Sequence, residues 1–401
     1  MPGSNVPGNP GNGVAIGSPV SFSLPMNRFA IHTRVAVPAV VAGLCMLVMS
    51  CPFATFDQAG DRVVAHDDVG ATEPTYVGKQ VCRECHQENF ELHRHSGHAD
   101  TFATTLESKI AKKYAEKALD AGEPYGVFQY RFGQEGLQSR RTADPNGGPF
   151  PLHYVLGSGR NAVTLLTLID DNGPDVAGVE HRISWFGSHG DFGLTPGHVG
   201  LVPHNELEHW GNVVRGESVR QCVDCHTTTG TIVGTEIINL VADVNCEKCH
   251  GPGSEHVRQS RVSSSPPPYS VGREQWDLES ELQLCGDCHR LPRHIDPGAL
   301  RAYANELLRF QPVGLLRSEC YLESAGTFMC STCHNPHQDS KTKSTADYEQ
   351  DCRNCHQPDS DEHVACSVSP THGCIECHMP AKTFEQGMVF HDHWIRIRKE
   401  P

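Results

Sequence analysis

Apolar residues follow three patterns along the 401-residue chain. Residues 35–49 form one almost wholly apolar run, which is short for a stable membrane span. Residues 125–215 contain short segments in which apolar and polar positions alternate between glycine- and Asp-Asn-Gly-type turns, a pattern that predicts strands. After residue 221, loops alternate with short segments of helical composition, including 283–290 and 300–310.

Two further stretches, residues 89–102 and 104–120, are helical in composition. Glycine (38) and proline (27) are plentiful and aromatic residues are few, which suits a loop-rich chain wrapped around cofactors better than regular layers. We therefore predict a mainly α fold with long irregular loops and a small β-rich insertion near residues 125–200.

The first 75 residues are typical of an export region. Residues 1–25 lack periodicity and are predicted to be disordered, and Met26 could be the true start. Basic residues then precede the apolar run, as in a secretory signal; an N-terminal membrane anchor is the alternative. Cys51 ends a lipoprotein-like box, so residues 1–51 are predicted to be a leader plus a signal peptide or lipoprotein signal. Ordinary cleavage near Cys51 is the other reading, and acidic residues 52–75 form a linker.

One pattern, Cys-x-x-Cys-His, occurs seven times between Cys82 and His378. In chain order, the seven motifs contain the cysteine pairs Cys82 and Cys85, Cys222 and Cys225, Cys246 and Cys249, Cys285 and Cys288, Cys330 and Cys333, Cys352 and Cys355, and Cys374 and Cys377. The histidines that end them are His86, His226, His250, His289, His334, His356 and His378.

This pattern is the attachment signature of c-type haem. Thiols at i and i+3 lie on one side of a helical turn and can bond both vinyl groups of one porphyrin, while the next histidine binds the iron as the proximal ligand. Structural zinc and iron–sulfur sites give no reason for a histidine after every second cysteine. The sequence therefore predicts seven haem c groups.

After residue 222 the motifs follow one another about every 25 to 45 residues, too closely for each haem to have its own domain. We expect one haem-stacked body over residues 76–398. Its N-terminal part, 76–215, would bind one haem, and its second part, 216–398, would bind six.

The number of histidines predicts that most irons have two histidine ligands and low reduction potentials, because 18 histidines remain besides the seven in the motifs. Spacing and small neighbouring residues favour six distal ligands: His98, His198, His256, His337, His372 and His393. The seventh stays unassigned among His153, His189, His204, His209 and His294.

Cys320 and Cys366 belong to no motif. In an oxidising compartment such a pair predicts a disulfide, with free buried thiols as the alternative.

The formal net charge is −15. Such an acidic chain is either simply soluble or docks a basic redox partner, such as another cytochrome or a membrane quinol-oxidising complex. No basic run or aromatic-basic platform indicates nucleic-acid binding. Whether several copies of the chain associate and so extend the line of haems is left open.

The motifs and their surroundings resemble the multihaem cytochrome c superfamily that includes the tetrahaem electron carrier of ammonia oxidisers and the cytochrome modules of tetratricopeptide-repeat proteins. The similar segments are YVGKQVCRECHQ, NCEKCHGPGSEHV, MCSTCHNPH, HGCIECHMP and DHWIRI. The resemblance supports His98, His256, His337, His372 and His393 as distal ligands, and His198 more weakly. This sequence differs from the tetrahaem carrier in having more haem motifs, and from the modular relatives because no tetratricopeptide repeat appears in it.

Two functions follow. The first is exported, periplasmic electron transfer, with membrane tethering if Cys51 is lipidated. The second is a multihaem oxidoreductase that acts on a small nitrogen or sulfur compound at one iron with an open site. No Cys-x-x-Cys-Lys motif occurs, which favours the carrier. A lone tyrosine (Tyr303 or Tyr321), or a cluster of His189, Asp191, His204 and His209, could still serve an enzyme.

Overall fold

Strands are far more numerous than the sequence predicts. The computed structural model describes residues 73–263, 277–357 and 366–398, which lie in one unit, Gly70–Pro401. Among them 35% of residues are helical and 24% are in strands. The prediction of a mainly α fold is therefore wrong. The predicted leader, the apolar run and Cys51 lie outside the described residues.

All strand pairs are antiparallel. The strands are β1 (Phe102–Thr104), β2 (Ala118–Asp120), β3 (Val127–Gly133), β4 (Gly136–Arg141), β5 (Phe150–Leu152), β6 (Tyr154–Leu156), β7 (Ala162–Ile169), β8 (Ala177–His181), β9 (Ile183–Phe186), β10 (Asp191–Leu194), β11 (Gly211–Arg215), β12 (Thr227–Val233), β13 (Glu236–Ala242), β14 (Ala381–Thr383) and β15 (Val389–His391). Seven form one sheet in the order β1-β6-β7-β8-β11, with β9 on β7 and β10 on β9. Four form the sheet β2-β3-β4-β5, and two hairpins, β12-β13 and β14-β15, complete the set.

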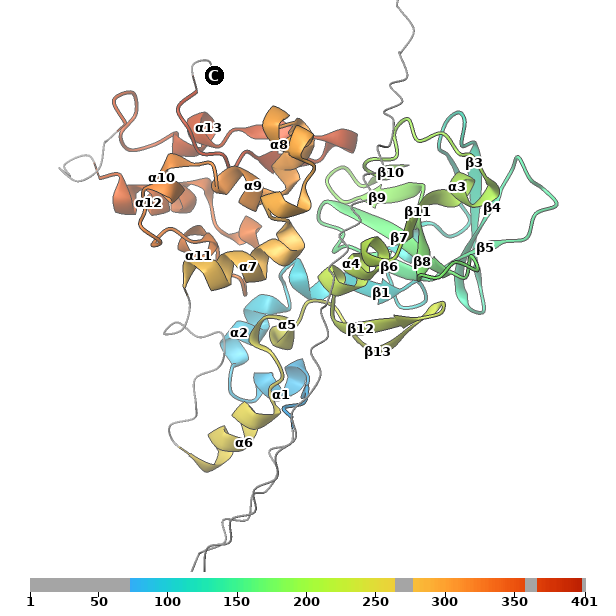
Figure 1. Cartoon of the computed structure of the whole chain (residues 1–401), viewed down its shortest axis with the longest axis horizontal. Coiled ribbons are helices and arrows are strands. Elements are labelled where there is room, and N and C mark those ends of the chain that lie inside the picture. Colours follow the sequence, from blue (N-terminus) through green and yellow to red (C-terminus); the bar gives the residue numbers. More distant parts are fainter. Residues whose placement is uncertain (1–72, 264–276, 358–365, 399–401) are drawn as a thin grey trace, which may run out of the picture. The chain divides into compact units, whose positions relative to one another are not determined.

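The helices are short, and most of them carry or border a haem motif. They are α1 (Lys79–Arg83), α2 (Gln87–His93), α3 (Glu206–Trp210), α4 (Glu217–His226), α5 (Cys246–His250), α6 (Ser254–Val262), α7 (Leu278–His289), α8 (Pro297–Ala302), α9 (Gln311–Leu315), α10 (Glu319–Leu322), α11 (Cys330–Cys333), α12 (Thr345–Cys355) and α13 (Cys374–His378). Single 3₁₀ turns are η1 (His98–Asp100), η2 (Ala111–Lys113), η3 (Pro292–His294), η4 (Asn305–Arg309), η5 (Ser340–Thr342) and η6 (Glu385–Gly387). The colours of Figure 1 show that β1 to β11 come from one continuous stretch, whereas the chain after residue 277 is mainly helical.

The seven-stranded sheet has two buried faces. On β7, Val163 and Leu165 join a core shared with Phe128 and Leu137 of the four-stranded sheet. Because side chains alternate along a strand, Leu166 and Leu168 point the other way, into a second core that includes Val219 of α4. This second face therefore positions α4, the helix of the second haem motif.

The predicted helix over residues 104–120 is wrong. Ala111 and Tyr114 are fully buried in the first core, where a single 3₁₀ turn places them. Residues 118–120 then pair with β3, as Leu119 opposite Phe128 shows. Helical propensity is a weak preference that burial and strand pairing override.

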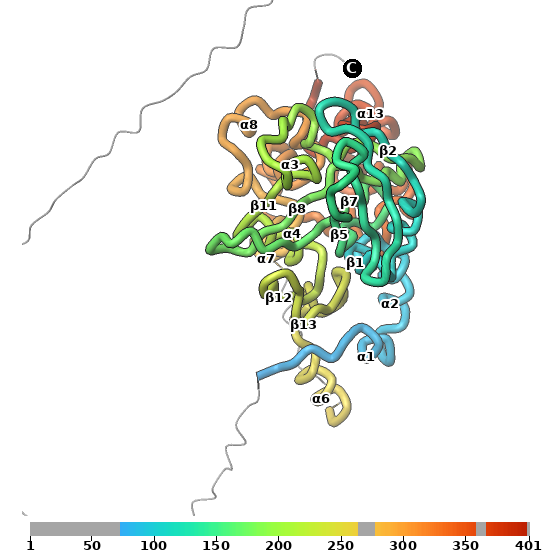
Figure 2. Tube along the Cα trace, turned by 90° about the vertical axis from the view of Figure 1, so that its right-hand side faces the viewer, coloured from blue at the N-terminus to red at the C-terminus, as the bar shows by residue number. Residues whose placement is uncertain are grey.

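The N-terminal helix α1 lies beside α6, as Figures 1 and 2 both show. Arg261 of α6 pairs with Glu84 at 3.2 Å, and the backbone N–H of Thr75 donates to the Ser254 hydroxyl at 2.8 Å. The first motif is thus held by the segment that follows the third.

We predict that Leu165→Ala lowers the free energy of unfolding by about 2–5 kcal/mol, because it leaves a cavity between the two sheets. Urea unfolding of the haem-loaded protein, followed by circular dichroism, measures the change. Leu106→Ala is the matched control, since Leu106 is 50% exposed. Equal effects of the two substitutions would contradict a shared core.

Candidate haem sites

Each of the seven motifs has its first cysteine on a helix, from α1 for Cys82 to α13 for Cys374. One helical turn separates the two cysteines of a motif, so both thiols face the same side. This arrangement suits two covalent bonds to one porphyrin edge, with the following histidine available to the iron.

Four motif histidines face a second histidine from a distant part of the chain. The ring centroids are 6.2 Å apart for His86 and His256, 6.2 Å for His98 and His289, 6.1 Å for His250 and His337, and 6.3 Å for His334 and His393. Three pairs have nearly parallel rings, at 28°, 6° and 29°, while the rings of His98 and His289 cross at 74°.

These separations match two imidazoles on opposite sides of one iron. Two metal–nitrogen bonds of about 2 Å, the length imidazole makes to a first-row metal, plus about 1.1 Å from each nitrogen to its ring centroid, give roughly 6.2 Å. Ordinary stacked rings can lie closer than this. The donor set therefore fits a bis-histidine haem at the first, third, fourth and fifth motifs.

The second ring nitrogen of several motif or partner histidines is held by the protein. Nδ1 of His393 donates a hydrogen bond to the His391 carbonyl oxygen at 2.9 Å. Nδ1 of His226 donates one to the Thr101 carbonyl oxygen at 3.2 Å. Nδ1 of His378 bonds the Arg396 carbonyl oxygen at 3.1 Å. Such bonds fix the tautomer and leave Nε2 free for a metal.

Burial also favours the ligating form of these rings. It lowers the pKa of His393 to about 4, although the bond to the His391 carbonyl acts in the opposite direction. Burial lowers the pKa of His98, His334 and His337 as well. These imidazoles are therefore neutral near pH 7, as metal binding requires.

A buried carboxylate fixes the segment that carries His393. Asp392 is 3% exposed and accepts hydrogen bonds from the Tyr303 hydroxyl at 2.7 Å and the Trp394 N–H at 2.9 Å. Gly314 allows this close approach, because a Cβ there would lie 2.6 Å from the Trp394 nitrogen. Tyr303, one of the lone tyrosines considered for an enzyme, is thus part of the support of a candidate ligand.

The structure places the other two predicted distal histidines elsewhere. His198 is 1% exposed, and its Nε2 lies 3.1 Å from Oε2 of Glu180. His372 is exposed, and its Nδ1 lies 3.2 Å from the Thr371 hydroxyl. Among the described residues neither ring faces a motif histidine at the separation seen in the four pairs.

The candidates for a seventh ligand are also dispersed. His153 meets Tyr154 edge-on at 5.9 Å, His189 stacks on Phe186 at 5.5 Å, and Nδ1 of His294 accepts from the Leu291 N–H at 3.2 Å. His204 is exposed, and His209 lies in α3.

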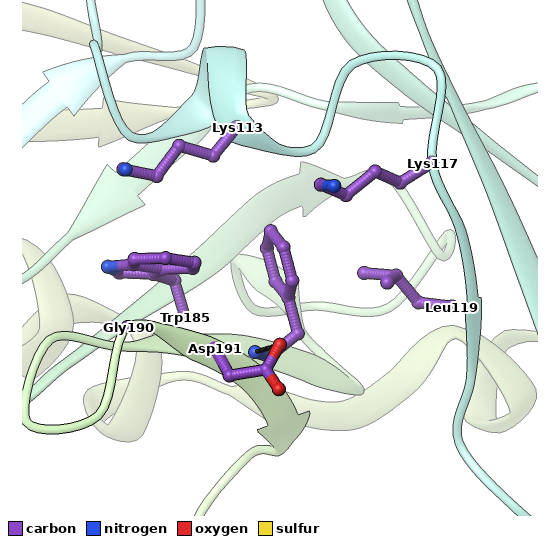
Figure 3. Close-up of a pocket in the computed structure, with 7 residues that line it drawn as sticks. Lys113, Lys117, Leu119, Trp185, Gly190 and Asp191 are labelled. Atoms are coloured by element: carbon purple, nitrogen blue, oxygen red, sulfur yellow. Dashed lines mark hydrogen bonds between the residues drawn. The ribbon is translucent and has the colours of Figure 1, made fainter.

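Asp191 does not join His204 and His209 in a cluster. It lines a surface pocket with Trp185, Phe192 and two lysines (Figure 3). The Lys113 ammonium lies over the Trp185 ring, 4.4 Å from its centroid. Asp191 therefore belongs to this pocket, and a role of the segment above an open iron stays a prediction.

Thiols of different motifs lie against each other. The thiols of Cys82 and Cys246, of Cys225 and Cys288, and of Cys285 and Cys330 are close enough to act on each other's pKa. These contacts connect the first motif with the third, the second with the fourth, and the fourth with the fifth. Because the cysteines mark the porphyrin edges, neighbouring haems would meet edge to edge at these points.

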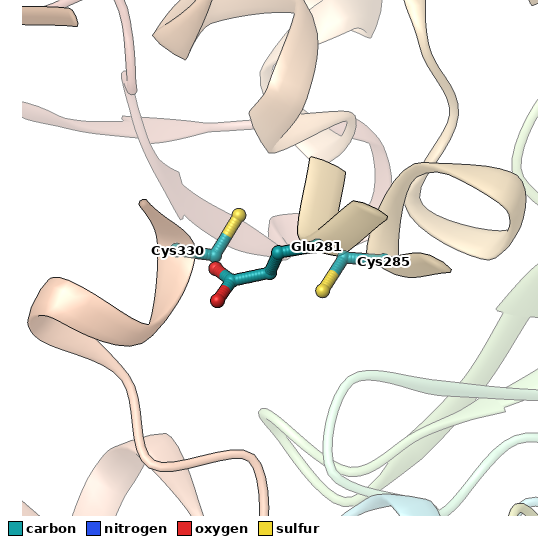
Figure 4. Close-up of side chains that lie close together, drawn as sticks. All are labelled: Glu281, Cys285 and Cys330. Carbon is teal, nitrogen blue, oxygen red and sulfur yellow. The ribbon is translucent and has the colours of Figure 1, made fainter. Parts of the chain in front are cut away.

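Sequence reasoning missed a set of buried glutamates that join motifs. Glu281 of α7 is 1% exposed, and its two oxygens accept from the Ser331 N–H at 2.8 Å and the Ser331 hydroxyl at 2.6 Å. It thereby ties the helix of the fourth motif to that of the fifth. Figure 4 shows it beside Cys285 and Cys330, and the three ligand atoms lie within 4.8 Å of one another. Since both cysteines belong to haem motifs, we assign Glu281 to structure, not to a separate metal ion.

Two other glutamates repeat this arrangement. Glu247, inside the third motif, accepts from the N–H groups of Val77 and Gly78 at 2.8 Å each, just before the first motif. Glu349, three residues before Cys352, accepts from the Ile375 N–H of the seventh motif at 3.4 Å. An acidic residue within or one turn before a motif is the sequence signal that could have identified them.

The predicted disulfide is wrong, because Cys320 and Cys366 are both free. Cys320 lies within electrostatic reach of Cys355 in the sixth motif, and Cys366 acts on Cys374 in the seventh. The two thiols thus neighbour different motifs.

The repeated motif and the paired imidazoles fit a chain that would bind several c-type haems. The family model described as "Cytochrome c554 and c-prime" matches residues 81–128 and 204–251, which contain the first three motifs and His98. This match confirms the resemblance to the multihaem c-type cytochromes, and with it haem c as the cofactor and electron transfer by haem as the general function.

The solved structure titled "Crystal Structure of Outer Cell Wall Cytochrome OcwA" is 14% identical, with a TM-score of 0.44, and the match covers 80% of this chain and 79% of that one. No curated protein matches the chain. Within the described residues, none of the helices has the length and apolar character needed to cross a membrane.

We predict that Glu281→Ala lowers the free energy of unfolding by about 1–3 kcal/mol, because it leaves the Ser331 N–H without its acceptor. Chemical denaturation of the haem-loaded protein measures this. Glu279→Ala, on an exposed position of the same helix, should change stability by less than about 0.5 kcal/mol. If both variants behave alike, Glu281 does not tie the two motifs.

Proposed function

We propose that this protein is an exported electron carrier that binds seven covalently attached haems, most of them with two histidine ligands. The observation that carries the proposal is the set of four imidazole pairs at 6.1–6.3 Å. An iron bound by two imidazoles has no open position for a substrate, and histidine in place of methionine keeps its potential low. Both properties suit transfer of electrons.

The contacts between motifs support a continuous path. Cys249 of the third motif acts electrostatically on Cys285 and Cys288 of the fourth. Cys352 acts on Cys333 of the fifth motif, and Cys374 acts on Cys352. Together with the three neighbouring thiol pairs, these interactions support a haem order of first, third, fourth, fifth, sixth and seventh, with the second as a branch at the fourth.

The candidate distal ligands come from segments that follow other motifs. His256 follows the third motif and faces the first, while His337 follows the fifth and faces the third. Each of these haems would therefore be bonded to two separate segments of the chain. Such crosslinks hold the redox centres at fixed separations, which is what the protein contributes to electron transfer.

Partners and location follow from charge and the N-terminal sequence. The net charge of −15, to which haem propionates add, favours a basic redox partner such as another cytochrome or a membrane quinol-oxidising complex. The basic residues and apolar run before residue 50 support export to the periplasm. Lipidation of Cys51 would tether the carrier to a membrane.

We predict that the mature protein carries seven haems. Intact-mass analysis should show seven haem additions, and reductive titration should consume seven electrons reversibly. Cys285→Ala with Cys288→Ala should remove one haem, whereas Cys320→Ala, outside the motifs, should leave seven. Fewer than seven haems in protein made with a full maturation system would contradict the proposed cofactor content.

A second prediction concerns the distal ligand of the fifth motif. His393→Met should raise the midpoint potential of one haem by on the order of 0.1 V, within the roughly 0.8 V that axial ligands span. His391→Met is the matched control, because the substitution keeps the backbone carbonyl that accepts from His393. Potentiometric titration followed by optical absorption measures the midpoint potentials. Identical titrations of wild type and His393→Met would show that His393 is not an iron ligand.

The alternative function is an oxidoreductase acting on a small nitrogen or sulfur compound. It requires one iron without a sixth protein ligand. Electron paramagnetic resonance of the oxidised protein distinguishes the two: entirely low-spin signals, unchanged by small ligands, indicate a carrier only. A high-spin signal that responds to ligands adds a second activity.

A further inference from the structure

The second motif differs from the four paired ones. His226 is oriented by the Thr101 carbonyl, yet among the described residues no imidazole faces it at about 6 Å. The neighbouring sheet and the C-terminal half of the chain instead bring charged side chains to this motif. These are Glu180, His198, Arg290 and Arg309.

Glu180 lies on the face of the sheet that carries α4. It is the cross-strand partner of Leu166, which packs with Val219 of α4. Two residues earlier on the same strand, a Cβ on Gly178 would lie 3.0 Å from a Val219 methyl. Burial raises the pKa of the Cys222 thiol to about 12, and the Glu180 carboxylate contributes in the same direction, so it lies within electrostatic reach of the motif.

His198 is fixed against Glu180 and is almost fully buried. Its Nε2 lies 3.1 Å from the carboxylate, and its backbone carbonyl accepts from the Tyr125 hydroxyl at 2.9 Å. Its buried Nδ1 has no hydrogen-bond partner. Burying a polar nitrogen this way is costly, which indicates a role beyond packing.

Two arginines complete the group. The Arg309 guanidinium lies 4.8 Å from the Phe310 ring centroid and 5.5 Å from that of Phe384, and its buried Nε has no partner. Arg290 lies over the same Phe310 ring, at 5.5 Å, and its charge acts on both Cys222 and Cys225.

The charges around Arg309 connect these elements. Glu180 acts on Arg309, as do Glu306 and Glu385. Glu385 is itself bound to the loop before His198, since it accepts from the Gly197 N–H at 2.8 Å. The cationic side chains thus lie against aromatic rings and within reach of carboxylates, and no described carboxylate forms a close ion pair with Arg309.

We propose that Glu180, His198, Arg290 and Arg309 line a binding site for a small inorganic oxyanion at the haem of the second motif, whose His226 faces no imidazole of the described residues. Guanidinium groups bind oxyanions through charge-assisted hydrogen bonds. The carboxylate–imidazole pair can hold or deliver a proton to a bound oxygen. The proposal goes beyond electron transfer and requires only that the second motif carries its haem.

The test uses the haem-loaded protein and nitrite as the probe. The oxidised protein should show a high-spin haem that becomes low-spin as nitrite binds, followed by optical titration and electron paramagnetic resonance. Arg309→Gln should weaken nitrite binding tenfold or more, and Arg309→Lys should weaken it less. Arg301→Gln, an exposed position on α8, is the matched control and should leave nitrite binding unchanged.

Binding of carbon monoxide to the reduced protein tests access to the iron independently of the charged side chains around it. As a neutral ligand it should bind wild type and Arg309→Gln alike. Cys222→Ala with Cys225→Ala should abolish the nitrite response while the low-spin signals of the paired haems, which report folding, persist. Each of three results overturns the proposal: no ligand-responsive haem in wild type, equal nitrite affinity of wild type and Arg309→Gln, or a nitrite response that survives loss of the second haem. None of these results changes the count of seven electrons, so the proposed carrier function is tested separately.

Discussion

The arrangement of this chain depends on pairs of imidazole rings held about 6 Å apart. A helical turn can present two thiols and one histidine, but it cannot supply the ligand on the other side of an iron. That ligand must come from another segment, and the ring that faces the histidine of the fourth motif is that of His98, from a remote part of the chain. Because an iron–nitrogen bond tolerates little variation in length, each pair fixes the distance between two remote parts of the chain. The short helices and long loops follow from this requirement.

Buried carboxylates also fix the distances between segments of the chain, without a metal ion. Glu247, Glu281 and Glu349 each accept backbone N–H groups from the segment of another motif. A buried carboxylate is stable only when its oxygens are fully used, so its position specifies where the neighbouring helix must lie. The paired histidines would hold the haems, and these glutamates hold the helices that carry the motif cysteines.

The sequence predicted what is local and missed what is long-range. The motifs are read from five consecutive residues, and small neighbours indicated His98, His256, His337 and His393, which the structure places opposite motif histidines. Which motif each would face could not be predicted, since no local pattern encodes contacts over a hundred residues. The extent of the strands was missed for the same reason: residues 118–120 have helical composition but pair with β3. The Cys320–Cys366 bridge failed because counting cysteines carries no information on distance.

The β-rich region gives the second motif its distinct surroundings. The four paired motifs differ from it. Each is faced by a histidine from a segment that follows another motif. Helix α4 instead packs on the seven-stranded sheet through Val219, and a sheet presents side chains only at the fixed spacing of its strands. On that face the sheet presents Glu180, which acts electrostatically on Cys222, and His198 lies against its carboxylate. The second motif is therefore positioned by a sheet and bordered by polar side chains, whereas the four paired motifs are connected through histidines from other segments.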